Sequence, residues 1–347
     1  MRPKIQRFFM LLAALLLCLS GCGKKDLFIT GSSDILAVAA GQSWFYYQQQ
    51  DEISAVNSQT QKVHRLGQGF LTGSDDRYVY LWQTSDQIAV LEGIRTLAAF
   101  DCPTAPAYWG TADGCAYFTA TDQNQEKISY LLYVLDLSGM ELRQYPLSGI
   151  PEAVAAEGEQ IYYIGYWAQD LRLCRYDLAN AQEQVLPESG SFTDESALFC
   201  LEGELYYAGK TAFCRLSPDD LQEEVLWEAE EIPDAVYSGN LACLRYKKGE
   251  EQFLWIYDMR ERRVLSNEAA AIEKLYQSAF GLIYAQGQEY WLDGAAARAF
   301  IDARNPIDQI DGSPAGFIAS TGEGELFIAF LQPNGSYETK QLIEAFH

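Results

Sequence analysis

The chain has 347 residues, of which 48% are hydrophobic and 13% aromatic, and its formal net charge is −23. This composition can form a large buried core and excludes an intrinsically disordered chain. The acidic balance excludes nucleic acid as an expected partner, because a negative surface repels phosphate backbones, and it provides no attraction to anionic lipids.

The first residues have the pattern of an export signal. Arg2, Lys4 and Arg7 give a positive start, and residues 8–19 form an apolar run that is too short to span a bilayer. The run ends in Leu19-Ser20-Gly21-Cys22, which resembles the lipobox of bacterial lipoproteins at every position.

This resemblance implies that residues 1–21 are a lipoprotein signal peptide and that a diacylglyceryl group is attached to the sulfur of Cys22. Two or more acyl chains hold a protein stably on a bilayer, whereas one chain does not. Residues 22–34 would then be a lipidated tether at the extracytoplasmic face of the cell membrane, either at the cell surface or in the periplasm. The alternative is an ordinary secretory signal followed by a chance cysteine.

Residues 160–186 and 204–227 repeat one pattern of strand, turn, strand, turn and short strand. Aromatic and β-branched residues fill the runs, and turn-forming residues separate them. The matching segments are Ile161-Tyr162-Tyr163 with Cys174-Arg175, and Leu205-Tyr206-Tyr207 with Cys214-Arg215. A repeat of this size that consists only of strands is typical of a β-propeller.

The second-strand position of this repeat recurs along the chain at intervals averaging about 39 residues, which suits a four-stranded blade. The equivalent positions are Tyr46, Tyr80, Tyr117, Tyr162, Tyr206, Ala242, Tyr284 and Phe317. A weaker segment rich in small residues precedes each position and is expected to line the central axis. These segments are residues 35–40, 69–72, 107–110, 153–156, 197–201, 235–237, 272–276 and 307–310.

The sequence therefore predicts an all-β fold, a β-propeller of eight four-stranded blades in one domain that spans residues 35–347. Seven blades remain possible if one hairpin is an insertion, because the third strand of the seventh unit, Glu289–Leu292, is short. Residues 26–30 could pair as an outer strand of the last blade and close the ring. The whole mature chain resembles bacterial lipoproteins with β-propeller domains, through the lipobox and these repeats.

The mature chain has six cysteines besides Cys22, and an even number outside the cytoplasm permits disulfides. Cys102 and Cys115 flank a turn-rich stretch and are the best candidate pair. Cys174 and Cys214 occupy equivalent positions in adjacent blades, too far apart to bond, and are expected to be small buried hydrophobic residues.

No catalytic, metal or cofactor site is expected. The only histidines are His64, in a predicted edge strand, and His347, the last residue, so neither a catalytic triad nor a histidine metal site is predicted. The sequence has no paired C-x-x-C, no EF-hand spacing and no glycine-rich phosphate loop. It also lacks the tryptophan docking motifs of quinoprotein-type propellers. Adjacent carboxylates are interpreted as solvated turns rather than a glycosidase pair.

The turns between second and third strands should gather on one face of the ring, where loops on a rigid scaffold commonly bind ligands. Five residues at these turns are candidates for a binding surface, since exposed aromatic residues can anchor a partner. They are Tyr166, Trp167, Tyr246, Lys247 and Lys248.

These features favour a monomeric, membrane-anchored, non-enzymatic binding or scaffold protein with a protein or glycan partner. One alternative is an enzyme that acts on extracellular glycans, which requires paired carboxylates in the axial funnel. Another is a sensor or accessory subunit of a membrane complex, which requires a partner in the membrane.

Overall fold

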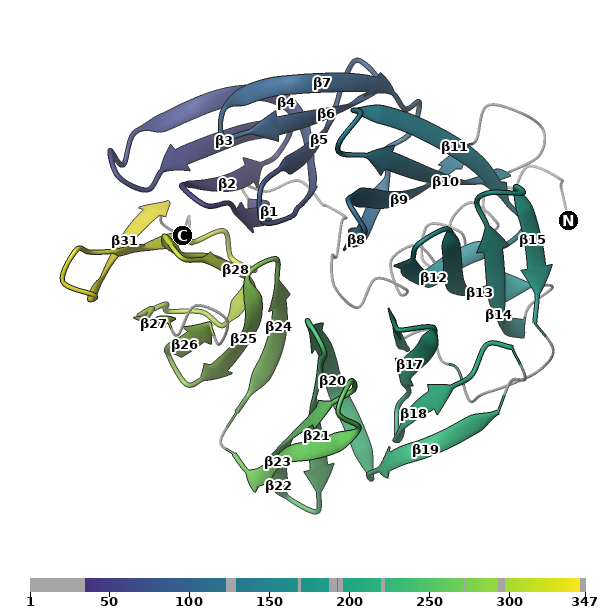
Figure 1. Cartoon of the computed structure of the whole chain (residues 1–347). Helices are drawn as coiled ribbons and strands as arrows, with labels where there is room; N and C mark the ends of the chain where they lie inside the picture. The colour runs from purple at the N-terminus through teal and green to yellow at the C-terminus, as the bar shows by residue number, and fades with distance from the viewer. Residues whose placement is uncertain are drawn as a thin grey trace, which may run out of the picture.

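The computed structural model describes residues 35–122, 129–167, 170–186, 192, 196–219, 222–270, 272–292 and 297–343. The predicted signal peptide and tether lie outside these ranges. The regular structure of the described residues consists of 31 strands in seven antiparallel sheets. The sheets are arranged around a central axis as in a β-propeller (Figure 1), which agrees with the predicted fold class. Within those ranges, no helix has the length and apolar character needed to cross a membrane.

Six of the sheets contain four strands each, and these strands follow one another along the chain. The first of these sheets consists of β8 (Ala107–Ala112), β9 (Cys115–Asp122), β10 (Ser129–Asp136) and β11 (Glu141–Leu147). The second consists of β12 (Ile150–Glu157), β13 (Gln160–Trp167), β14 (Asp170–Asp177) and β15 (Gln182–Val185). The third consists of β16 (Ala197–Leu201), β17 (Glu204–Ala208), β18 (Ala212–Leu216) and β19 (Glu223–Glu228). The fourth sheet consists of β20 (Glu231–Ser238), β21 (Leu241–Lys248), β22 (Glu251–Asp258) and β23 (Arg263–Ala269). The fifth consists of β24 (Lys274–Ser278), β25 (Gly281–Gln286), β26 (Glu289–Leu292) and β27 (Ala297–Phe300). The sixth consists of β28 (Ile307–Ser313), β29 (Gly316–Thr321), β30 (Leu326–Leu331) and β31 (Tyr337–Ile343).

The seventh sheet has seven strands because one long strand belongs to two neighbouring parts of the ring. The strands are β1 (Ile35–Ala40), β2 (Trp44–Gln49), β3 (Glu52–Asn57), β4 (Val63–Ser74), β5 (Val79–Gln83), β6 (Gln87–Glu92) and β7 (Arg95–Asp101). The first half of β4 pairs with β3 as far as Gln68, and the second half pairs with β5 from Gly69 onward. Gly69 permits this close crossing, because a Cβ there would clash with the carbonyl oxygen of Trp82 and its φ is +152°.

The repeat positions inferred from the sequence all fall in the strands expected for them. The eight second-strand residues lie in β2, β5, β9, β13, β17, β21, β25 and β29. The innermost segments also match, with one shift: β24 begins at Lys274 rather than at Ile272. The main-chain N–H of Glu273 bonds to the carbonyl oxygen of Ala285 at 2.9 Å, just before the regular ladder starts.

The core lies between neighbouring sheets, so most strands are buried on both faces. The two tyrosines of β13 show how: Tyr163 packs in a cluster with Tyr117 of the preceding sheet, and Tyr162 packs with Tyr207 of the following sheet. Tyr206 in turn packs with Trp255 of the next sheet. The repeated tyrosine pair therefore fills both interfaces of its sheet, since adjacent strand residues point to opposite faces.

The ring closes where the last sheet meets the first. The Phe45 and Phe330 rings lie 5.8 Å apart in a shared apolar cluster. The main-chain N–H of Ala40 donates to Asp311 Oδ2 at 2.8 Å. Among the described residues, β31 is the outer strand of the last sheet. The predicted closing strand at residues 26–30 lies outside the described ranges.

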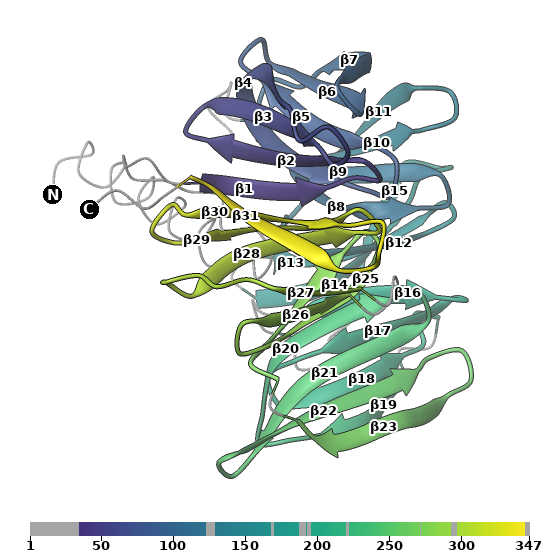
Figure 2. The same ribbon diagram turned by 90° about the vertical axis from the view of Figure 1, so that its left-hand side faces the viewer.

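The strands run between the two faces of the ring, seen edge-on in Figure 2. We call face A the face that carries the turns between second and third strands, and face B the opposite one. The connections between sheets also lie on face A; for example, the main-chain N–H of Ile232 bonds to the carbonyl oxygen of Lys210 at 2.7 Å. Ile35 pairs with Gln49 beside the β2–β3 turn, so the described chain also begins on face A.

Candidate functional site

Trp167 is the last residue of β13 and lies on face A. Trp167 is 37% exposed, whereas the other six tryptophans are buried or half-buried. It pairs across the hairpin with Asp170. Gly149 lies beneath it: a Cβ on Gly149 would lie 2.8 Å from the carbonyl oxygen of Tyr166 and 3.8 Å from Cε3 of the indole. The connection before β12 therefore packs closely against the indole of Trp167.

Charged groups lie on the same hairpin as the indole. Arg172 Nη2 and Asp170 Oδ2 form an ion pair at 3.4 Å, with 23% of the arginine side chain and 70% of the aspartate side chain exposed. Tyr166 is half-buried and pairs with Ile150. The hairpin thus offers an apolar platform with a guanidinium and a carboxylate nearby, a combination suited to contacting another macromolecule.

Tyr246 differs from the exposed position that the sequence predicted. It is buried, with its ring 5.1 Å from that of Phe253 and 5.4 Å from that of Trp227. Its hydroxyl donates to Asn267 Oδ1 at 2.8 Å, and burial raises the pKa of its phenol. The reason is that β21 extends to Lys248, which puts Tyr246 inside the strand with its side chain toward the core.

The two predicted lysines differ from each other in exposure. Lys247 Nζ forms an ion pair with Glu231 Oε2 at 2.7 Å, and this hydrogen bond holds the pKa of the Glu231 carboxyl below its usual value. Lys248 is exposed at the end of β21. The sheet of β16–β19 separates these residues from Trp167 in the ring order. The structure therefore does not bring the five predicted residues into one cluster.

The predicted disulfide is absent: Cys102 and Cys115 are both free thiols. Cys102 lies on face A, where its N–H bonds to the carbonyl oxygen of Asp86 at 2.8 Å. Cys115 begins β9 after the turn on face B, at the far end of β8. Six strand residues cover about 20 Å at roughly 3.3 Å each, whereas the Cα atoms of a disulfide lie about 4.4–6.8 Å apart. Sequence proximity was misleading because a whole strand separates the two.

The buried cysteines have the chemistry of packing residues. Cys174 is buried among apolar side chains, as predicted, and so is Cys214. Burial raises the pKa of the Cys102 and Cys174 thiols to about 11. Their thiolate forms are therefore disfavoured at neutral pH, which makes them poor nucleophiles.

The buried carboxylates take part in the fold. Asp75 accepts hydrogen bonds from the main-chain N–H groups of Arg77 and Tyr78, at 2.8 and 2.6 Å, and from the Tyr80 hydroxyl. Glu325 accepts hydrogen bonds from the side-chain amides of Asn305 and Gln341, at 3.1 and 3.2 Å. Their oxygens therefore bind groups of the protein itself. The described part of the chain contains no group of three or more His, Cys, Asp and Glu residues that could hold a metal ion.

Of the two histidines, only His64 lies in the described part of the chain. The His64 ring packs edge-on against Trp44 with centroids 5.3 Å apart, and His347 lies outside the described ranges.

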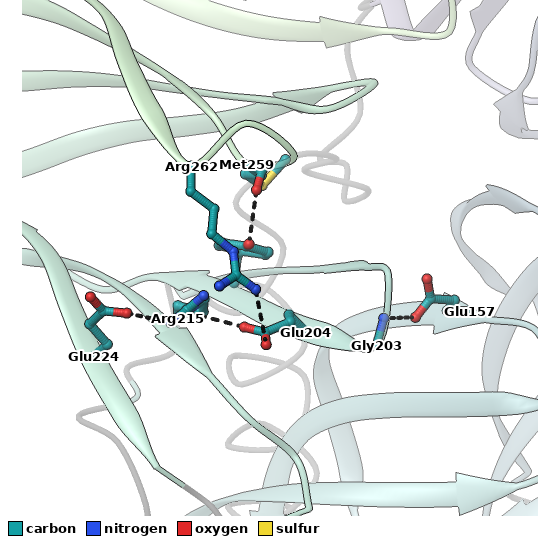
Figure 3. Close-up of polar contacts among 8 residues, drawn as sticks. Glu157, Gly203, Glu204, Arg215, Glu224, Met259 and Arg262 are labelled. Atoms are coloured by element: carbon teal, nitrogen blue, oxygen red, sulfur yellow. Dashed lines mark hydrogen bonds and ion pairs between the residues drawn. The ribbon is translucent and has the colours of Figure 1, made fainter.

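Face B carries an ion-pair network that the sequence analysis missed (Figure 3). Arg215 bonds to Glu204 at 3.1 Å and to Glu224 at 2.6 Å, while Arg262 of the next sheet reaches Glu204 at 3.4 Å. The hydroxyl of Tyr206 donates to the carbonyl oxygen of Met259 at 3.2 Å. These contacts join the sheet of β16–β19 to that of β20–β23.

A carboxylate also links neighbouring sheets at the turns of face B. Glu157 Oε2 accepts the main-chain N–H of Gly203 at 2.6 Å and the thiol of Cys200 at 3.2 Å (Figure 3 shows the first contact). Asp113 Oδ2 accepts the N–H of Gly158 at 2.7 Å in the same way one sheet earlier. The only sequence signal is an acid in one turn and a glycine in the next, which is too common to identify the contact.

No protein-family model and no curated protein matches the chain. Among solved structures, the crystal structure of TolB from Acinetobacter baumannii aligns with a TM-score of 0.42 at 10% identity, over 89% of this chain and 79% of that one. The Kluyveromyces lactis Hsv2 structure aligns with a TM-score of 0.41 at 7% identity, over 90% of this chain and 98% of that one. At these TM-scores the likeness carries no inference about function.

Proposed function

We propose that this protein is a lipid-anchored, extracytoplasmic β-propeller that binds a protein partner through face A around Trp167, without catalysing a reaction. The observation that carries the proposal is the exposed indole of Trp167 at the face A end of β13. Tryptophan and arginine are the residue types most enriched among the side chains that dominate binding energy. Trp167 and Arg172 lie on the same hairpin.

Burial distinguishes Trp167 from the tryptophans that stabilise the fold. Trp255 is fully buried in an aromatic cluster between sheets, whereas Trp167 leaves much of its ring in water. Exposed apolar surface has an unfavourable free energy of about 25 cal/mol per Å², which a partner would remove on binding. A rigid strand end also keeps the conformational entropy lost on binding small.

We propose eight blades of four strands each. The support is the division of β4, whose halves pair with β3 and β5 in separate ladders. When these halves are counted as two strands, the seven-stranded sheet becomes two blades of four strands, and together with the other six sheets these make eight blades. An experimental density map with seven or fewer blades would overturn this count.

The anchor is proposed from the lipobox alone. Mass spectrometry of the intact protein from native membranes should show a chain that begins at Cys22 and carries acyl mass. A soluble, unmodified chain that begins at another residue would contradict the anchor.

The binding proposal is tested by affinity isolation of the lipidated protein from its native membranes. Trp167→Ala should reduce the affinity for the co-isolated partner by about 2 kcal/mol, roughly thirtyfold, and leave the melting temperature unchanged. Leu331→Ala is a matched control, because Leu331 is 41% exposed beside the β30–β31 turn on face B. Equal capture by wild type and Trp167→Ala would overturn the proposal. Glycan cleavage by the purified protein, lost when one carboxylate is changed, would overturn its non-enzymatic part.

A further inference from the structure

We infer that face A is turned toward the membrane that holds the lipid anchor, and that the partner of Trp167 is a protein embedded in that same membrane. The inference rests on the proposed function and on lipidation at Cys22. It adds the orientation of the ring and the location of the partner, both of which follow from the place where the chain enters the fold.

The chain enters the ring on the face that carries Trp167. Ile35, the first described residue, pairs with Gln49 at the end of β2. Trp167 occupies the corresponding end of β13. Both strands are second in their sheet, and the sheets follow one another around the axis in the same sense (Figure 1). The two strand ends therefore lie on the same face.

The length of the chain before Ile35 limits how the ring can be oriented. About 13 residues separate Ile35 from Cys22, and they can span at most about 45 Å when fully extended. Because Ile35 is itself on face A, these residues have a short distance to cover when face A is nearest the bilayer. Face A can therefore lie near the bilayer without stretching the chain.

The opposite orientation would require a nearly extended chain. The tether would first pass outward from the innermost to the outermost strand of a sheet, about 14 Å for three strand spacings of about 4.8 Å. It would then pass along the outer edge of the ring from face A to face B, about 20 Å for a six-residue strand. Side chains at the rim lengthen this path further. Most of the available length would be used. The structure therefore favours face A toward the membrane.

Charge keeps face A from lying flat on lipid. Asp170, Glu228, Glu230 and Glu250 are exposed at turns or connections of this face, and the whole chain is strongly acidic. Anionic lipid headgroups repel such a surface over a distance of about 8–10 Å. The exposed indole then lies close to the bilayer but not in it. The extracytoplasmic segment of a membrane protein would fit this position.

The orientation is testable without a partner by energy transfer to a dye-labelled lipid. The lipidated full chain is placed in vesicles, with Cys115→Ser as background and a donor dye on either Ser85→Cys or Gln59→Cys. Ser85 is exposed in the β5–β6 turn of face A, and Gln59 is exposed in the β3–β4 turn of face B. The Ser85 dye should lie closer to the bilayer by about one strand length, roughly 20 Å. Equal distances, or the reverse order, would overturn the orientation.

The location of the partner needs a second measurement. A photo-crosslinking residue at position 167 in native cells should capture a protein that stays in the bilayer after an alkaline wash. A captured protein that washes off would overturn the membrane location. Adhesion of delipidated protein to anionic vesicles, lost in Trp167→Ala, would show that face A binds lipid and would also overturn it.

The binding surface and the orientation of the ring can be disproved independently of each other. If the dye distances are as expected but Trp167→Ala still binds the partner, the proposed binding surface is wrong and the orientation stands. If Trp167→Ala loses the partner but the two dyes are equidistant from lipid, the binding surface stands and the orientation is wrong.

Discussion

The two faces of the ring use polar residues differently. On face B, Glu157 and Arg215 contact neighbouring turns or strands, and Arg262 joins one sheet to the next. On face A, Trp167 and Lys248 are exposed at strand ends. The comparison indicates that charged groups of face B join neighbouring sheets, whereas the ion pairs Lys247–Glu231 and Arg172–Asp170 of face A each lie within one sheet and leave Trp167 exposed beside them. Changes on face B should therefore affect stability, and changes on face A should affect binding.

Side chains buried between sheets should contribute more to the free energy of unfolding than those on either face. Trp255→Ala should lower the free energy of unfolding by about 3–5 kcal/mol, because it removes a fully buried ring from the interface between two sheets. Denaturant unfolding followed by circular dichroism measures the loss. A loss below about 1 kcal/mol would mean that the aromatic cluster is not the main contact between these sheets.

The Glu157 contact links turns of two neighbouring sheets on face B. Glu157→Ala should cost about 0.5–1.5 kcal/mol, because the Cys200 thiol and the solvent-exposed N–H of Gly203 lose their acceptor. Glu159→Ala, in the exposed part of the same turn, is the control and should stay within about 0.5 kcal/mol of wild type. If the two variants have equal stability, the carboxylate does not link the sheets.

The ion pairs of Arg215 and Arg262 on face B should contribute less to stability than the Glu157 contact. Arg262 is 55% exposed and its contact with Glu204 is 3.4 Å long, so Arg262→Ala should cost about 0.2–1 kcal/mol at low salt and less at high salt. Denaturant unfolding at two salt concentrations measures this difference. A cost above about 2 kcal/mol that salt does not change would show that packing, rather than charge, links these sheets.

The Lys247–Glu231 ion pair on face A should have the smallest effect on stability. The Glu231 carboxyl has a lowered pKa because Lys247 donates to it, so its stabilising effect is present above the ordinary value near 4.5 and is lost as pH falls below that value. An NMR titration should show the pKa of Glu231 rising in Lys247→Met. An unchanged pKa would show that the pair does not form in solution.

The repeat was readable from the sequence because each strand position has a consistent physical role. Tyr162 and Tyr163 point into opposite interfaces of one sheet, so two neighbouring apolar or aromatic residues recur at this strand position, as they do at Tyr206 and Tyr207. The continuous strand β4 was not readable, because it depends on a close crossing at Gly69 that only the folded chain reveals.

The site was less predictable than the fold, since exposure depends on where a strand ends. Trp167 is exposed as expected, but β21 runs far enough to bury Tyr246. Cys102 and Cys115 are close in sequence and lie on opposite faces. The contact between Glu157 and Gly203 joins two turns 46 positions apart and leaves no mark in local sequence.

The most direct test compares Trp167→Ala and Glu157→Ala in the same two assays, unfolding in denaturant and capture of the partner from native membranes. Trp167→Ala should keep its free energy of unfolding within about 0.5 kcal/mol and lose roughly thirtyfold in capture. Glu157→Ala should lose about 0.5–1.5 kcal/mol of stability and capture the partner normally. The opposite pattern, with Trp167→Ala unstable but still binding and Glu157→Ala stable but unable to bind, would contradict the division between a structural face B and a binding face A.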